Sequence, residues 1–271
     1  MSLTPQPKDP FLWIQAPWGQ ALQCGPLARI ADHLFTTRQI PLDKEGHSEG
    51  WSAVSRAIGV APHALLRLTQ VHGADVAVVH HADPDPRRHD GAHADIVVSD
   101  RQDVAIAVQV ADCVPLLLAD RRSGAVAAAH AGWRGMAAGV PRAAVESMAR
   151  ELGSRPADLV AAIGPSIGPC CYEVGEEVRE AFGRAGFLSD ALSRWFVAGR
   201  RGRPHLDLWQ AARDQLVKAG LAQGHIHICG LCTATHRHVF HSYRAEGPGT
   251  GRMVGVIRAG AGRREPGPRG Y

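Results

Sequence analysis

A series of short apolar segments in the middle of the chain constrains its fold more than any other feature. Each segment has the length of an ordinary strand and is rich in Val, Ile, Leu or Ala. Residues 120–124 separate two of them with a polar, glycine-terminated stretch that is typical of a tight turn. The predicted strands are residues 75–79, 95–98, 104–110, 115–119 and 125–130. We therefore expect the middle of the chain to form β-sheet.

Helical patterns follow these strands. Apolar residues at helical spacing predict helices over residues 140–152, 176–182 and 207–219, and further strands are expected at 225–229 and 253–257. Strands and helices thus occur in runs, without a repeated βαβ unit and without a glycine-rich phosphate-binding motif. This order favours an α+β fold with a mixed sheet over a doubly wound fold.

The length and composition suit one large domain. The chain has 271 residues, of which 45% are hydrophobic, and this is enough to bury a sizeable core. We expect a single domain, 1–271, with its core at about 20–259. The polar, proline-rich start, 1–10, and the Gly-, Pro- and Arg-rich end, 260–271, are expected to be flexible.

Charge and hydropathy argue against nucleic-acid and membrane partners. The formal net charge is only +4, and no basic stripe carries interleaved aromatic residues. The excess base lies in Arg200, Arg201 and Arg203 and in Arg263, Arg264 and Arg269. The longest apolar stretch, 104–119, is too short to span a bilayer and is interrupted by polar residues. Because no apolar signal segment follows the start, we expect a cytoplasmic protein.

Three separate segments each place a metal-competent side chain beside glycine or a charge. They contain His72, Cys113 and His130. Two imidazoles and one thiolate match a catalytic zinc site, which takes three protein ligands and keeps a fourth position for water or substrate. Six cysteines in a cytoplasmic protein are also more consistent with thiols or metal ligands than with disulfides. These segments predict a metal site assembled by the fold.

Several motifs in a fixed order resemble the bacterial laccase-domain family, also called the multicopper polyphenol oxidase or purine nucleoside phosphorylase family. The resemblance extends from about residue 34 to 257. The motifs are residues 69–73 (TQVHG), 111–113 (ADC), 130–135 (HAGWRG), 163–169 (IGPSIGP), 172–175 (YEVG) and 250–253 (TGRM). Each motif alone is weak evidence, whereas the ordered set is specific.

The resemblance implies an αββα architecture, in which two mixed sheets pack face to face and are flanked by helices. It also implies a zinc ion bound by His72, Cys113 and His130, with Cu²⁺ as the alternative ion. The implied activities are phosphorolysis of adenosine, inosine or methylthioadenosine and deamination of adenosine. The partners would then be a purine nucleoside and phosphate, while the resemblance leaves the oligomeric state open.

Two segments depart from the family pattern. After Thr37 and Arg38 the family usually has a Gly-Gly-Val-Ser type loop, but this chain has residues 39–42 (QIPL). Near the end, residues 242–246 (SYRAE) replace a more basic Arg-Arg-Asp pattern. Because the first loop would border the substrate pocket, the substrate is less firmly predicted than the metal site.

The remaining candidate site residues follow from the chemistry. Arginine matches phosphate or carboxylate with a planar fork, and Arg38 and Arg134 are the candidates for an anion contact. Proton transfer needs a carboxylate within reach, for which Asp112 and Glu173 are the candidates. Asp112 has the alternative role of orienting His72 or His130.

A second metal site is a further possibility at the end of the chain. His225, His227, Cys229 and Cys232 combine two imidazoles with a Cys-x-x-Cys pair. A single Cys-x-x-Cys pair is only half of a structural zinc site, so packing in the core and surface histidines are the favoured interpretation.

Other functions remain open at this point. A copper polyphenol oxidase would need many clustered histidines, whereas the 15 histidines are scattered except for two His-x-His pairs. An amide hydrolase that edits peptidoglycan precursors is also known in the family. A thiol hydrolase would use Cys113 as nucleophile with His130 or His72 as base. A binding adaptor would turn over no substrate.

Overall fold

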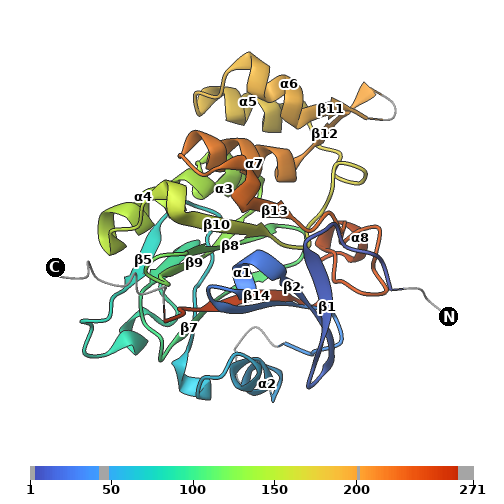
Figure 1. Ribbon diagram of the computed structural model, residues 1–271. Coiled ribbons are helices and arrows are strands. Elements are labelled where there is room, and N and C mark those ends of the chain that lie inside the picture. Colours follow the sequence, from blue (N-terminus) through green and yellow to red (C-terminus); the bar gives the residue numbers. More distant parts are fainter. Residues whose placement is uncertain (1–3, 43–48, 200–201, 262–271) are drawn as a thin grey trace.

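The computed structural model describes residues 4–42, 49–199 and 202–261 (Figure 1). The chain forms two six-stranded sheets, a small two-stranded ribbon and helices that cover them. The predicted flexible end beyond residue 261 lies outside the described residues, as do Arg200, Arg201, Arg263, Arg264 and Arg269. Part of the unfamiliar segment that follows residues 39–42 also lies outside them.

The first sheet combines the two ends of the described chain with its middle. Strand β14 lies at its centre and pairs antiparallel with β3 and β7, while β4 is parallel to β7. In spatial order the strands are β1 (Phe11–Ala16), β2 (Gly19–Cys24), β3 (Asp32–Thr36), β14 (Met253–Arg258), β7 (Ala105–Val110) and β4 (Leu65–Arg67).

The second sheet is also mixed. Strand β8 pairs antiparallel with both β9 and β10, and the two outer pairs, β10 with β13 and β5 with β6, are parallel. In spatial order the strands are β13 (Ile226–Ile228), β10 (Leu159–Ile163), β8 (Val114–Asp120), β9 (Val126–Ala131), β6 (Ile96–Ser99) and β5 (Val76–Val79).

Helices cover the outer face of each sheet. Helix α2 covers the first sheet, whereas α3, α4 and α7 cover the second (Figure 1). The helices are α1 (Gly25–Ala28), α2 (Glu49–Ala57), α3 (Trp133–Ala137), α4 (Val140–Leu152), α5 (Glu176–Arg184), α6 (Ser189–Trp195), α7 (Leu208–Lys218) and α8 (Tyr243–Glu246). Short 3-10 helices occupy Pro62–Ala64, Pro86–His89, Pro156–Asp158 and Gln223–His225.

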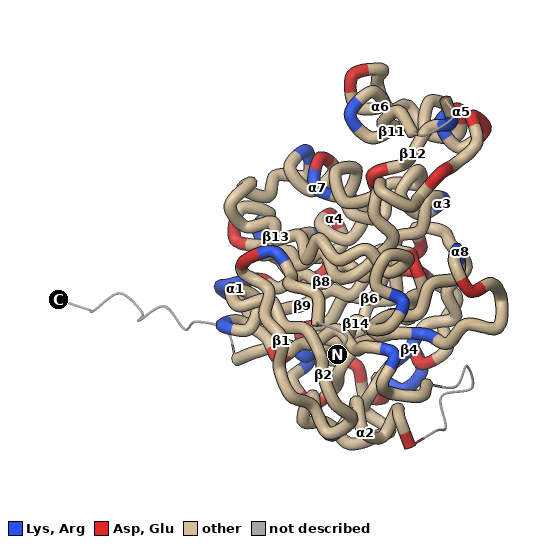
Figure 2. Tube along the Cα trace, turned by 90° about the vertical axis from the view of Figure 1, so that its right-hand side faces the viewer, with Lys and Arg blue, Asp and Glu red and all other residues tan. Residues whose placement is uncertain are grey.

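Helices α5 and α6 lie together with the ribbon of β11 (Phe196–Ala198) and β12 (Pro204–Leu206), beyond α7 and away from the two sheets (Figures 1 and 2). Aromatic rings join this group, since Phe182 packs edge-on against Trp195 and Phe196. The same residues belong to the core on the helical side of the second sheet.

The alternation of side chains along β8 explains the layers. Leu116 and Leu118 pack with the helices on one face, whereas Leu117 and Ala119 pack between the two sheets. Because successive strand residues point to opposite faces, a strand buried on both faces must be apolar throughout. Each leucine that is fully buried in this way contributes roughly 1.5–3 kcal/mol. The resulting helix–sheet–sheet–helix order confirms the predicted αββα architecture.

Local sequence signals set the ends of these elements where they were predicted. Helix α4 begins with a proline in its first turn and ends at Gly153, which adopts the left-handed conformation with φ 65°. The predicted turn at 120–124 joins β8 to β9, and the Asp120 carboxylate accepts hydrogen bonds from Arg122 N and Ser123 Oγ. No helix among the described residues is long and apolar enough to cross a membrane.

Buried His33 on β3 gives the fold a pH-sensitive element. Its Nδ1 donates to Ala31 O at 3.2 Å, and its Nε2 accepts from Cys24 N at 3.0 Å, so this bonding fits the neutral ring. Burial, opposed in part by the Ala31 carbonyl, lowers the pKa of His33 to about 4. A proton on Nε2 would place a charge in the core and remove the bond from Cys24.

We expect the protein to lose stability as the pH falls from about 6.5 to about 4. Across that window the unfolded chain binds a proton at His33 and the folded protein does not. The contribution of neutral His33 to the free energy of unfolding is therefore fully present above pH 6.5 and is lost as the pH falls below it. The full cost is about 3 kcal/mol. Urea unfolding between pH 7 and 4 measures it. His33→Gln should flatten this part of the profile and His63→Gln, at an exposed position, should not; equal profiles for all three proteins would contradict the assignment.

Candidate metal centre

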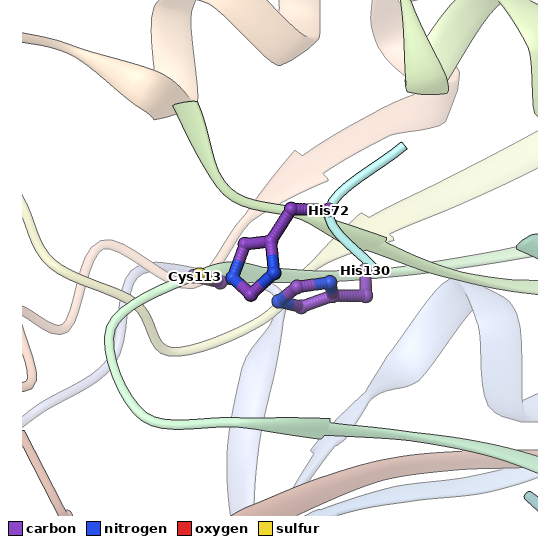
Figure 3. Close-up of side chains that lie close together, drawn as sticks. All are labelled: His72, Cys113 and His130. Atoms are coloured by element: carbon purple, nitrogen blue, oxygen red, sulfur yellow. The ribbon is translucent and has the colours of Figure 1, made fainter. Parts of the chain in front are cut away.

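The structure brings His72, Cys113 and His130 together from three segments that are far apart in the sequence. His72 lies between β4 and β5, Cys113 lies between β7 and β8, and His130 lies on β9 (Figure 3). Their candidate ligand atoms all lie within 4.8 Å of one another. The two imidazole rings have centroids 4.8 Å apart and are nearly perpendicular, at 82°. The predicted donor set is therefore assembled.

Unusual backbone conformations present the site. His72 has φ 62° and Asp112 has φ 89°, and they are the non-glycine residues with positive φ in the described part of the chain. Such conformations are costly and persist where surrounding contacts enforce them, often at functional sites. At this site the strained positions are His72, a candidate ligand, and Asp112, the neighbour of the candidate ligand Cys113.

The buried carboxylate of Asp95 holds the His72 loop in place. It accepts hydrogen bonds from the backbone N–H groups of Val71, His72 and Gly73, at 3.2, 3.1 and 2.7 Å. Asp95 directly precedes β6 and is 0% exposed. One carboxylate thus satisfies three successive donors of the loop, which fixes the positive φ of His72.

Asp95 also orients the second imidazole. Its Oδ1 lies 2.7 Å from His130 Nδ1, so Nδ1–H is the donor and Nε2 is left to face Cys113. A carboxylate that fixes the tautomer and ring orientation of a histidine is typical of metal sites. Burial raises the pKa of Asp95, but His130 and the backbone donors outweigh this and lower it below its usual range.

The three donors are electrostatically coupled. Burial alone would raise the pKa of Cys113, but the imidazoles of His130 and His72 lower it to about 6. Burial alone would lower the pKa of His130, but Cys113 and Asp95 raise it to about 9. The protein without metal therefore stabilises a thiolate beside an imidazolium, and a cation would replace the proton on His130.

Gly132 leaves room for the donors to meet. A Cβ atom at this position would lie 2.8 Å from Cys113 Sγ and 3.3 Å from His72 Cδ2. A side chain there would push the thiol and the imidazole apart. The close approach explains why glycine follows the His130 segment.

These residues fit a zinc ion. Zinc binds thiolate and imidazole nitrogen, and its catalytic sites use three protein ligands. The bond from His130 to Asp95 leaves the other ring nitrogen free for a metal, and the depressed pKa of Cys113 supplies the thiolate. The described residues contain two other groups with metal-binding donors, Cys170 with Cys171 and Cys232, and His80 with His81 and Asp100.

The donor set lines a cavity of about 800 Å³. Three arginines, two tyrosines and a tryptophan contribute to its walls, and this combination suits a ligand with both an anionic and a flat apolar part. The lining residues include Gln70, Trp133, Arg134, Tyr172, Tyr243, Arg244 and Arg252, together with the metal-binding donors and Asp112.

The predicted anion-binding residues fall in different places. Arg134 lines the cavity, with its guanidinium 4.3 Å from the Trp133 ring centroid. Arg38 is not among the lining residues; it pairs with Glu246 at 3.0 Å and also donates to the Arg237 carbonyl. Glu246 is the last residue of α8, so Arg38 secures the helix that carries Tyr243 and Arg244. Arg38 was predicted to contact the substrate directly. In the structure it instead supports α8, whose residues Tyr243 and Arg244 line the cavity.

The carboxylate candidates for proton transfer also separate. Asp112 lines the cavity, but Thr233 Oγ1 donates to its Oδ1 at 2.5 Å and Arg244 N donates to its Oδ2 at 2.6 Å. Glu173 points elsewhere and pairs with Arg203 at 3.0 Å. The suggestion that Asp112 orients His72 or His130 is corrected, because Asp95 performs that task.

Sequence reasoning missed Asp95 as well as the aromatic walls Tyr172 and Tyr243. The sequence did contain a signal for Asp95, since a carboxylate directly before the apolar run 96–98 needs buried donors. The less favoured second metal site at His225, His227, Cys229 and Cys232 does not form: in the described residues, Cys232 groups with Cys170 and Cys171 instead. Strand β13 is too short to carry all four.

The fold and the donors together define a class of protein. In this class, two mixed sheets covered by helices hold a His–Cys–His donor set at their junction, in the wall of an open cavity. The crystal structure of the Bacillus licheniformis hypothetical protein YfiH has this fold: it covers 93% of this chain and 100% of its own, with a TM-score of 0.81 and 28% identity.

A sequence model of the family described as multi-copper polyphenol oxidoreductase laccase matches residues 43–260. The chain belongs to this family, which confirms the resemblance inferred from the ordered motifs.

Curated relatives in the family are named for purine nucleosides. A purine nucleoside phosphorylase of Bacteroides thetaiotaomicron is 39% identical over 163 residues, 60% of either chain. One of Deinococcus radiodurans is 41% identical over 210 residues, 78% of this chain and 76% of its own. Adenosine deaminase RL5, from an unknown prokaryotic organism, is 37% identical over 207 residues, 74% of this chain and 78% of its own.

Proposed function

We propose that this enzyme cleaves purine nucleosides with phosphate and also deaminates adenosine, at a zinc ion held by His72, Cys113 and His130. The observation that carries the proposal is the donor set itself, which lines a cavity that also contains three arginines. The purine part of the proposed substrate is inferred from the relatives named purine nucleoside phosphorylase and adenosine deaminase. Zinc in such a site supplies Lewis acidity and activates water near neutral pH.

The arginines of the cavity would bind phosphate. Arg244 donates to the Glu173 carbonyl, and Arg252 donates to the carbonyls of Thr250 and Gly251. These contacts are with neutral groups, and no ion pair forms at Arg134, Arg244 or Arg252 within the residues described. Their positive charge is therefore available to an anion, and their planar forks match phosphate oxygens.

The aromatic residues would bind the base. Two of the rings, Trp133 and Tyr172, already have a guanidinium over them, at 4.3 Å for Arg134 and 5.0 Å for Arg244. This arrangement places flat apolar surface beside positive charge, as a nucleoside and a phosphate require. Tyr243, which is 51% exposed, provides a further ring at the cavity.

Asp112 is our candidate for proton transfer, because it is the carboxylate that lines the cavity next to a metal-binding donor. Both of its oxygens accept hydrogen bonds, from Thr233 and from Arg244 N. Taking up a proton would therefore weaken one of these bonds, which also hold Thr233 and α8 against the cavity. Proton transfer at Asp112 would thus be coupled to the positions of Thr233 and α8 in the cavity wall.

A thiol hydrolase is the second candidate, and the depressed pKa of Cys113 beside His130 favours it. The copper polyphenol oxidase is not favoured, since the donor set contains only two imidazoles. The cytoplasm remains our proposed location, and it is consistent with six free cysteines.

Adenosine and inosine, incubated with the protein in phosphate and in a phosphate-free buffer, test the proposal. We expect free base and ribose 1-phosphate from both nucleosides only with phosphate, and ammonia from adenosine in either buffer. Removing the metal with a chelator should abolish both activities, and zinc should restore them. Activity that survives chelation but is lost on alkylation would favour the thiol hydrolase; no product from zinc-loaded protein would refute the proposal.

A further inference from the structure

Three cysteines outside the candidate metal centre form a second cluster of donors. The Sγ atoms of Cys170, Cys171 and Cys232 all lie within 4.8 Å of one another, and all three cysteines are free thiols. Cys232 is buried, Cys171 is half-buried and Cys170 is exposed. The cluster therefore extends from the interior to the surface, where an ion could enter.

Two loops that are far apart in the sequence form the cluster, and hydrogen bonds connect them. Residues 166 and 232 form an isolated parallel bridge between the loops, and Thr233 N donates to Ser166 O at 3.1 Å. Within the first loop, Cys171 N and Tyr172 N both donate to Gly168 O. The spacing of the thiols is thus set by backbone contacts and does not depend on flexible side chains alone.

Hydrogen-bond donors already contact the buried sulfur atom of the cluster. Gly168 N donates to Cys232 Sγ at 3.2 Å, and Thr235 contacts Cys232 through its backbone N–H and its hydroxyl. The same hydroxyl, Thr235 Oγ1, lies 3.3 Å from Cys171 Sγ and 3.6 Å from Cys170 Sγ. The donors to Cys232 Sγ stabilise the thiolate of that residue, and thiolate is the form that binds metal.

We propose that Cys170, Cys171 and Cys232 form a second metal site, which binds a thiophilic cation, Zn²⁺ or Cu⁺, through three thiolates. Soft sulfur ligands select these ions over Mg²⁺ or Ca²⁺. A tetrahedral or trigonal ion would draw the thiols closer by small side-chain movements, since metal–sulfur bonds of about 2.3 Å place ligand atoms roughly 4 Å apart.

The site would stabilise the wall of the cavity. Its two loops both contact Asp112, since Ile167 N donates to Asp112 O at 2.9 Å and Thr233 Oγ1 donates to Asp112 Oδ1. Tyr172, which follows the thiol pair, lines the cavity directly. An ion bound by both loops would therefore restrain the positions of Asp112 and Tyr172 in the cavity wall. It would do so from outside the cavity, without contacting the substrate.

Cadmium titration of the reduced Cys113→Ala protein tests the proposal, because the central site then has no thiolate. Sulfur-to-cadmium charge-transfer absorption must come from other cysteines. We expect one equivalent of Cd²⁺ to bind with the intensity of three thiolates and to raise the melting temperature. Adding Cys170→Ala, at an exposed position, should weaken binding by at least about tenfold, whereas adding Cys229→Ala, a buried thiol outside the cluster, should not.

Displacement by Zn²⁺ or by Cu⁺ then identifies the ion. Displacement of Cd²⁺ by either one supports the site, and the more effective of the two names its preferred ion. Absence of charge transfer, an unchanged affinity in the Cys170→Ala variant, or failure of both ions to displace Cd²⁺ would overturn it. None of these outcomes depends on nucleoside turnover, so the site stands or falls separately from the proposed function.

Discussion

Cys113→Ala protein should fold normally, retain little zinc at the central site and lose nearly all activity. The substitution removes the thiolate that the imidazoles of His72 and His130 stabilise, and two imidazoles alone make a poor site. Loss of several kcal/mol of transition-state stabilisation corresponds to a fall in kcat/KM on the order of 10³-fold. Elemental analysis, carried out with the Cys170→Ala change added to remove the proposed second site, and nucleoside kinetics measure the two effects.

The matched control is Cys24→Ala, which removes a buried thiol from the end of β2 in the first sheet. It should cost some stability because it leaves a small cavity, but zinc content and kcat/KM should stay near those of the unmodified protein. If the Cys113→Ala protein retained stoichiometric zinc at its central site, our assignment of the ligands would be wrong.

Asp95→Asn should impair the site almost as much, although Asp95 contacts no substrate. An amide offers one acceptor oxygen in place of two, so it cannot serve three backbone N–H groups and His130 Nδ1 together. We expect metal affinity to fall by roughly 10- to 100-fold, because His130 loses the partner that fixes its tautomer. The fold should lose roughly 3–5 kcal/mol.

Asp120→Asn separates these two effects. Asp120 is also a fully buried carboxylate with local donors, Arg122 N and Ser123 Oγ. It lies at the end of β8 that is far from Cys113. Urea unfolding should show destabilisation of both variants, while metal titration should show weakened binding only for Asp95→Asn. Equal metal affinities in the two variants would mean that Asp95 does not position the ligands.

The elements predicted from the sequence are those whose signals are local. Helix α4 could be placed from its apolar spacing and Gly153, and the β8–β9 pair from the turn at Asp120. Strand β10, at Leu159–Ile163, was missed, because a run of only five apolar residues, two of them alanine, does not distinguish a strand from a buried helical segment. The pairing of β14 with β3 joins residues from opposite ends of the chain, and its pairing with β7 joins the end to the middle; local patterns encode neither.

The same distinction applies to the site. His72, Cys113 and His130 stand beside recognisable glycines and charges, so the ordered motifs could identify them. Arg38 also belongs to a motif, yet its role depends on Glu246, a partner far along the chain. A motif thus predicted that these residues matter, but only the packed structure distinguishes a residue that lines the cavity from one that supports its wall.

The positions of the ligands at the junction of the sheets bear on how the protein folds. The His72 segment leaves the first sheet at β4 and enters the second at β5, and the Cys113 turn crosses in the same direction from β7 to β8. We expect the His72 and Cys113 segments to reach these positions only when both of the sheets that they connect are in place. Metal should be captured late in folding, after the sheets dock, and it should stabilise only the assembled protein, in proportion to the logarithm of its free concentration. The concentration of free zinc would then affect the unfolding rate of the assembled protein, while leaving its folding rate unchanged.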